Sequence, residues 1–188
     1  MAGYLSGIAI LLSFVPYLRD IFLNKTKPER ASWFLWAILG FISFFSQFAK
    51  GAFWSLIMTG AQAVGDFSIF ILAIKYGLGG FRKRDVMGLT GAAIGLILWY
   101  FTGEAATALF VVIFVDAIGA ALTAIKAYEN PATETVSSWA LTFLGGVLAC
   151  VAVGSFNLIL LAFPFYICLA SASILIAIKL GFKYGFLK

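Results

Sequence analysis

The chain contains 188 residues, of which 63% are hydrophobic and only 11% are charged. Soluble domains average ~45–50% apolar and ~25% charged residues, so a water-soluble globule of this size could not cover its apolar surface. Apolar blocks long enough to cross a bilayer follow one another along the chain, and the mean hydropathy is +1.04. The composition therefore predicts an all-α integral membrane protein. Disordered, fibrous and disulfide-framework proteins are excluded.

Few residues of this chain are suited to catalysis or metal binding. Histidine is absent, which removes the commonest general base, metal ligand and proton switch. The cysteines, Cys150 and Cys168, lie in apolar segments and lack metal-binding or redox spacing. We therefore expect no metal, no cofactor and no enzymatic activity. An intramembrane enzyme would need two aspartates to form a catalytic dyad, and these aspartates lack recognisable flanking motifs.

Seven apolar spans are expected in chain order. They cover residues 3–22, 31–49, 53–75, 86–102, 105–126, 136–154 and 156–179. At a rise of about 1.5 Å per residue, these lengths suit a hydrocarbon core of ~30 Å. The connections are too short to fold separately, so the sequence predicts a single integrated membrane domain.

The 13 lysine and arginine residues are distributed unevenly between the two sides of these spans. If the N-terminus is outside, only Lys50 lies on the outer side, and the others, including Arg82–Arg84, lie on the inner side. Cytoplasmic loops carry an excess of Lys and Arg. We therefore predict a multi-pass protein of the cell (inner) membrane, with its N-terminus outside and its C-terminus cytoplasmic. Topology then accounts for the net charge of +5, and no nucleic acid is expected as a partner. Residues 82–84 either anchor this topology or bind acidic lipid headgroups.

Matches at an offset of about 105 residues relate the first and last thirds of the chain. The matched pairs are residues 71–77 with 175–181, Ser32-Trp33 with Ser138-Trp139, and Gly40 with Gly146. We predict a parallel repeat, with a first three-helix bundle at 1–77 and a second at 104–188 that includes a cytoplasmic tail. Residues 78–103 form the basic loop and the linker helix between them. Two like halves around an axis normal to the membrane enclose a cavity that either face could open.

The segment from Phe14 to Trp33 contains Pro16-Tyr17 in the first span, followed by a basic loop and a serine just before the second span. It resembles the PQ-loop signature of the SWEET, SemiSWEET and cystinosin-like transporters, with Tyr17 in place of the glutamine. Pnu-type vitamin transporters, which carry nicotinamide riboside, share a similar layout. The resemblance covers nearly the whole chain and implies seven transmembrane helices in a 3+1+3 arrangement. It also implies alternating-access transport of a small polar solute, either sugar-like or vitamin/nucleoside-like.

Two acidic residues lie deep within the expected spans. Asp66 and Asp116 are at similar depths, well before Lys75 and Lys126 at the inner edges of their spans. A carboxylate near the bilayer centre costs about 2.5–3.5 kcal/mol on insertion scales, so each should face protein or water. No lysine or arginine lies at this depth, which favours compensation by a proton, a metal cation or a cationic substrate. We predict that both aspartates bind substrate and carry protons for coupling. The alternative is a protonated or hydrogen-bonded carboxyl that serves packing.

Three further residues are predicted to bind substrate. Gln62 lies one helical turn before Asp66 on the same face, and Gln62-Ala-Val-Gly65 resembles the Asn-x-x-Gly of the third SWEET helix, where the asparagine contacts substrate. Tyr166 is at the repeat-equivalent position in the seventh span. Trp36 lies one turn inside the second span, where it could stack on a ring. For Gln62 and Tyr166 the alternative is a structural hydrogen bond between helices.

Two prolines and two further tryptophans complete the expected elements. Pro16 and Pro164 interrupt the hydrogen-bond ladders of the first and seventh helices. The resemblance implies that they act as hinges, and static kinks are the alternative. Trp33 and Trp139 lie at the starts of the second and sixth spans and are expected to anchor at the membrane interface.

A membrane receptor or binding protein without transport is the alternative function. A retinal pigment would need a lysine deep in the seventh span, whereas Lys179 lies at its inner edge. The expected partners are a small-molecule solute and the lipid bilayer, and a homo-oligomer remains an open alternative.

Overall fold

The computed structural model describes residues 1–49, 54–102 and 105–184. In these ranges the chain is all-helical and contains no strand, so the predicted all-α class is confirmed. The helices are α1 (Ala2–Phe22), α2 (Arg30–Ala49), α3 (Trp54–Tyr76), α4 (Lys83–Thr102), α5 (Ala105–Glu129), the 3-10 turn η1 (Pro131–Thr133), α6 (Val136–Val153) and α7 (Leu158–Tyr184). Lys50 and Lys188, which bear on the predicted orientation, lie outside the described residues.

Long apolar helices indicate a membrane-embedded protein. By length and composition, four helices of the described chain could cross a bilayer, namely α1, α6, α7 and the part of α5 at Leu109–Glu129. A shorter apolar stretch covers Arg30–Phe45 of α2. Large apolar side chains are exposed on the outer surface, among them Tyr4, Phe110 and Phe165, as expected for a surface that faces lipid.

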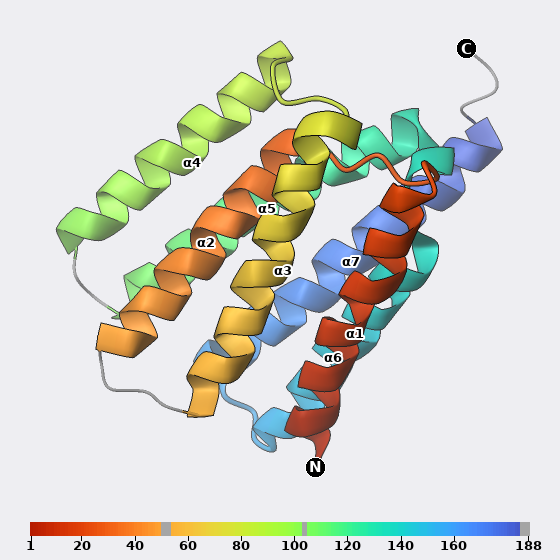
Figure 1. Cartoon of the computed structure of the whole chain (residues 1–188). Helices are drawn as coiled ribbons and strands as arrows, with labels where there is room; N and C mark the ends of the chain where they lie inside the picture. The colour runs from red at the N-terminus through yellow and green to blue at the C-terminus, as the bar shows by residue number, and fades with distance from the viewer. Residues whose placement is uncertain (50–53, 103–104, 185–188) are drawn as a thin grey trace.

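Six helices pack in a closed ring, and α4 lies outside it (Figure 1). In the first part of the chain α3 packs against both α1 and α2, and in the last part α7 packs against both α5 and α6. Contacts of α1 with α6 and of α2 with α5 close the ring. The described part of α4 packs mainly against α5 and more weakly against α2. The interior of the ring is therefore shared by both ends of the sequence.

Two glycines allow helix pairs to approach closely. A Cβ on Gly40 of α2 would lie 3.0 Å from the Cα of Ala63 in α3. A Cβ on Gly146 of α6 would lie 2.9 Å from the Sγ of Cys168 in α7. Small residues at such crossings replace side-chain packing by contact between backbones. The α2–α3 and α6–α7 pairs thus use matched glycines for the same purpose.

We call the end of the bundle where α1, α3, α5 and α7 finish, and where α2, α4 and α6 begin, the basic end. Hydrogen bonds join its loops: the backbone N–H of Lys27 donates to the Thr133 carbonyl (3.0 Å), and the Arg30 guanidinium donates to the Gly79 carbonyl (3.1 Å). The buried polar residues here are Thr26, Glu29, Ser32, Asp85, Thr123, Lys126, Glu134, Thr135 and Ser138. Side chains and loops therefore close the bundle at the basic end.

The expected spans agree with the helices to within a few residues, with one consistent difference. The expected spans 86–102 and 156–179 correspond to α4, which begins at Lys83, and to α7, which continues to Tyr184. An apolar window marks only the part of a helix that suits hydrocarbon, whereas the backbone ladder continues through charged residues into the polar layer. The basic ends of the helices are therefore longer than hydropathy alone indicates.

Candidate functional site

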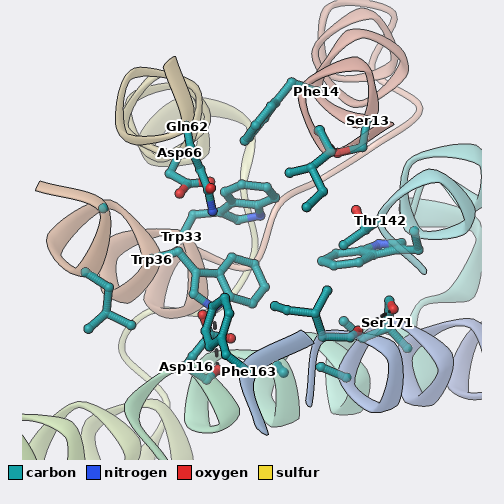
Figure 2. Close-up of a pocket in the computed structure, with 18 of the residues that line it drawn as sticks. Ser13, Phe14, Trp33, Trp36, Gln62, Asp66, Asp116, Thr142, Phe163 and Ser171 are labelled. Carbon is teal, nitrogen blue, oxygen red and sulfur yellow. Dashed lines mark hydrogen bonds between the residues drawn. The ribbon is translucent and has the colours of Figure 1, made fainter. Parts of the chain in front are cut away.

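A cavity of about 370 Å³ lies inside the ring (Figure 2). Residues of α1, α2, α3, α5, α6 and α7 line it, whereas none of the described residues of α4 does so. Its walls are mainly apolar and aromatic, with a few polar groups, which is the usual composition of a small-molecule site. The volume falls within the range of about 300–1,000 Å³ that such sites occupy.

Asp66 lies on α3 and points into this cavity (Figure 2). Its side chain is buried, and a Cβ on Gly40 would lie 3.6 Å from its Oδ2, so the carboxyl group sits where α2 and α3 approach closely. Within the described chain its carboxyl oxygens receive no hydrogen bond. Gln62, one turn earlier on α3, lies beside it at the exposed edge of the cavity.

Asp116 lies on α5 and reaches the cavity from another wall (Figure 2). The Tyr166 hydroxyl of α7 donates a hydrogen bond of 2.6 Å to its Oδ2. The Trp36 indole N–H donates to its backbone carbonyl at 3.4 Å. Tyr166 is not itself a lining residue, and it contacts the site through this carboxyl group. One aspartate is thus held by a neighbour, whereas the other is not.

Tryptophan rings form the part of the cavity wall nearest the basic end. The ring centroids of Trp33 and Trp36 are 5.0 Å apart and those of Trp36 and Trp139 are 5.9 Å apart. The Tyr17 ring packs against two of them, with its centroid 4.9 Å from that of Trp33 and 6.2 Å from that of Trp139. The expectation that Trp33 and Trp139 anchor at the membrane interface is wrong, because they are only 6% and 8% exposed and line the cavity. The ring of helices brings both helix starts to the bundle axis.

Two indole N–H groups point away from the cavity. Trp33 Nε1 donates to the Tyr17 hydroxyl at 3.2 Å, and Trp139 Nε1 donates to Glu134 Oε2 at 2.8 Å. Each indole has a single donor, so these bonds use it and fix the orientation of the ring. The faces and edges of the rings are then what remains for contact with an occupant.

The predicted site residues fall into two groups in the structure. Gln62, Asp66, Asp116 and Trp36 line one cavity, and Tyr166 bonds to Asp116. The two prolines lie inside α1 and α7, as the sequence requires, and neither lines the cavity. Their role as hinges stays a prediction.

A buried ion pair at the basic end was not predicted from the sequence. Lys126 Nζ lies 2.7 Å from Glu134 Oε1 and also donates to the Thr133 carbonyl at 2.8 Å. The side chains of this pair are 2% and 0% exposed. The Tyr17 hydroxyl donates to the same Glu134 oxygen at 3.5 Å. Sequence reasoning placed Lys126 at a span edge and Glu134 in a loop, and nothing in the local pattern indicated that they would meet.

The described residues that line the cavity include acidic groups and no basic ones. Across the described ranges no three acidic or cysteine side chains gather to form a metal site. Comparison with known proteins gives no match to a family model, a curated protein or a solved structure. The function is therefore argued from the site itself.

Proposed function

We propose that this chain is a transporter of small polar solutes that works by alternating access in the cell (inner) membrane. The observation that carries the proposal is the cavity of about 370 Å³ on the bundle axis, with Asp66 and Asp116 in its walls. Buried acidic residues in membrane-spanning helices are costly, and they commonly mark substrate, ion or proton pathways. The solute, sugar-like or vitamin/nucleoside-like, would occupy this cavity.

The proposed 3+1+3 repeat is supported by the order in which the helices pack. The order α1–α3–α2 in the first half recurs as α5–α7–α6 in the second, and contacts between unlike halves are also paired, α1 with α6 and α2 with α5. A Cβ on Gly77 would lie 2.6 Å from the Pro28 carbonyl, and a Cβ on Gly181 would lie 3.1 Å from the Pro131 Cβ. The matched glycines thus meet matched loops. Two like halves can rock about the axis between them.

The closed basic end supports a direction for the first step. In the proposed orientation, N-terminus outside and C-terminus cytoplasmic, the basic end faces the cytoplasm, and solute enters from the opposite side. Release to the cytoplasm then requires the contacts between the halves at this end to break. They include the Thr26–Thr135 hydroxyl pair, and the bond from Ser32 Oγ to the Gly119 carbonyl at 2.7 Å. Pro16 and Pro164 are the proposed hinges for this movement.

Proton coupling is proposed for Asp66 and Asp116. A carboxyl group in this cavity is the place where a proton can be taken up on one side and released on the other. Uptake of glucose, uridine and choline into proteoliposomes, each with and without an inward proton gradient, tests transport and coupling together. We expect saturable uptake of at least one of these solutes, increased by the gradient.

The aspartate variants sharpen this test. Asp66→Asn and Asp116→Asn should each lower gradient-driven uptake at least tenfold, and Glu129→Gln, which removes an exposed carboxylate, serves as the matched control. Full gradient-driven uptake by the double aspartate variant would exclude the aspartates from coupling. Binding of a solute to the purified protein without uptake of any of them would instead support the receptor or binding-protein function.

A further inference from the structure

We infer that the cavity selects organic cations, that is, small solutes whose positive charge is flanked by apolar groups, over neutral polyols. The inference rests on the proposed function in so far as the same cavity holds the transported solute. Binding selectivity, however, can be measured separately from transport. Three features of the cavity carry the inference: its acidic groups without basic partners, its small number of free donors, and its aromatic walls.

The first feature is a pair of acidic groups with no basic partner among the described residues that line the cavity. Asp66 and Asp116 line the cavity, and the described residues that line it include no lysine or arginine. Lys126, which lies on α5 like Asp116, is buried, but its Nζ is paired with Glu134 Oε1 at 2.7 Å. Arg30 is occupied by the Ala73 and Gly79 carbonyls. The positive charge that would balance the aspartates must therefore come from an occupant or from protons.

The second feature is that most donors in the cavity wall are already used within the protein. Hydroxyls of three lining residues donate to carbonyls of their own helices: Ser13 to Ile10 (2.6 Å), Thr142 to Ser138 (3.1 Å) and Ser171 to Ile167 (2.5 Å). Their oxygens can still accept a hydrogen bond.

The indole N–H groups are used in the same way. Trp33, Trp36 and Trp139 donate to Tyr17, to the Asp116 carbonyl and to Glu134 respectively. Among the lining residues named so far, the Gln62 amide remains as a donor. A polyol hydroxyl needs donors as well as acceptors, whereas a quaternary ammonium group has neither N–H donors nor acceptors and needs no donor from the wall. The shortage of free donors therefore disfavours a polyol and does not penalise an organic cation.

The third feature is the aromatic wall. Trp33, Trp36 and Trp139, together with Phe14 and Phe163, line the same cavity as the two aspartates (Figure 2). Tryptophan faces attract organic cations more strongly than other aromatic rings do, and the attraction increases when water is excluded. A bare inorganic cation would gain little from these rings. An organic cation would use both the carboxylates and the rings.

A matched pair of probes tests the charge alone. Choline and 3,3-dimethylbutan-1-ol have nearly the same shape, and only choline is charged. Equilibrium dialysis of radiolabelled choline against the purified full chain in detergent gives its dissociation constant, and competition gives that of the neutral alcohol and of glucose. We expect choline to bind at least tenfold more tightly than either neutral compound, and sodium ions at equal concentration not to displace it.

Variants assign the binding to this cavity. Asp66→Asn and Asp116→Asn should each weaken choline binding at least tenfold and leave binding of the alcohol unchanged. Glu129→Gln should bind choline as the unaltered chain does. Equal affinity for choline and its neutral analogue in the unaltered chain would overturn the inference without reference to any variant. Choline binding that survives both aspartate substitutions, or displacement by sodium ions, would overturn it as well.

The outcomes also separate this inference from the proposed function. If choline binds selectively but no solute is taken up by proteoliposomes, the transport proposal fails and the cation selectivity stands. If glucose or uridine is taken up while choline neither binds nor enters, transport stands and the cation inference fails.

Discussion

Two helices of the ring begin with the same residue types, but the glutamates of the two segments have different hydrogen-bond partners. The segment that leads into α2 contains Glu29, Ser32 and Trp33, and the segment that leads into α6 contains Glu134, Ser138 and Trp139. Glu29 Oε2 accepts hydrogen bonds from the N–H and the hydroxyl of Ser32, at 2.7 and 3.0 Å. Glu134 instead pairs with Lys126 and with the Trp139 indole, at 2.7 and 2.8 Å.

The difference arises from one buried cation. In the second segment the Glu134 carboxylate bonds to Lys126 of α5. The hydroxyl of Ser138 is therefore buried without a hydrogen-bond partner among the described residues. In the first segment the carboxylate stays with Ser32, whose hydroxyl also donates to the Gly119 carbonyl of α5. The same residue type thus caps a helix in one half and balances a charge in the other. We therefore expect equivalent substitutions in the two segments to change the free energy of unfolding by different amounts.

The largest effect is expected at the buried cation. Lys126→Met would leave Glu134 buried without its partner, and breaking such a pair typically costs about 3–5 kcal/mol of unfolding free energy. The midpoint of thermal unfolding in detergent should fall markedly. Adding Glu134→Gln to the same chain should restore much of the loss, because no charge is then left unpaired. A Lys126→Met variant as stable as the unaltered chain would show that the buried pair does not stabilise the fold.

Matched serine substitutions should have a smaller effect that differs between the halves. Ser32→Ala removes the hydroxyl that bridges Glu29 and the Gly119 carbonyl, and should cost about 1 kcal/mol. Ser138→Ala removes a buried hydroxyl without a partner in the described chain, and should be neutral or slightly stabilising. Thermal unfolding of the two variants side by side measures the difference. Equal losses in both would contradict the distinct bonding of the two segments.

The smallest effect is a pH dependence at Glu29. Burial raises the pKa of the Glu29 carboxyl above its usual value, and the nearby Asp85 carboxyl adds to the rise. The folded protein then binds this proton more tightly than the unfolded chain does. Its contribution to stability is full below the unfolded pKa of ~4.3 and is lost as the pH rises through the folded value.

Glu29→Gln keeps an acceptor for Ser32 and removes this titration. The variant should gain stability relative to the unaltered chain as the pH is raised from 4 to 7. Unfolding midpoints at several pH values measure the gain. A constant difference across this range would mean that Glu29 does not titrate with folding.

The helices were predictable because each is an apolar block bounded by charged or turn residues. Lys25 and Lys27, for example, follow α1 and mark the loop before α2. The contacts between helices were not predictable in the same way. Hydropathy does not say that α1 meets α6, or that Lys126 turns inward to Glu134 when other basic residues near it are exposed. Such pairings depend on the closure of the ring, which brings distant parts of the sequence together.

The site was predictable to the extent that burial cost identifies residues. Asp66 and Asp116 were expected to avoid lipid, and both line the cavity. Trp33 and Trp139 were assigned to the interface because a tryptophan at the start of a span usually lies there. Their place in the cavity wall follows from the loops at the basic end, which fold over these helix starts. The local sequence around these tryptophans does not indicate that the loops cover them.

The position of α4 has a consequence for how this architecture could be assembled. It packs on the outside of α5 and α2, and none of its described residues lines the cavity. It runs from the basic end to the opposite end of the bundle, so α5 begins at the same end as α1. The described cavity wall therefore comes from the six helices of the ring, whereas α4 connects α3 to α5. Substitutions on α4 therefore change the connection between α3 and α5 without altering the described residues that line the cavity.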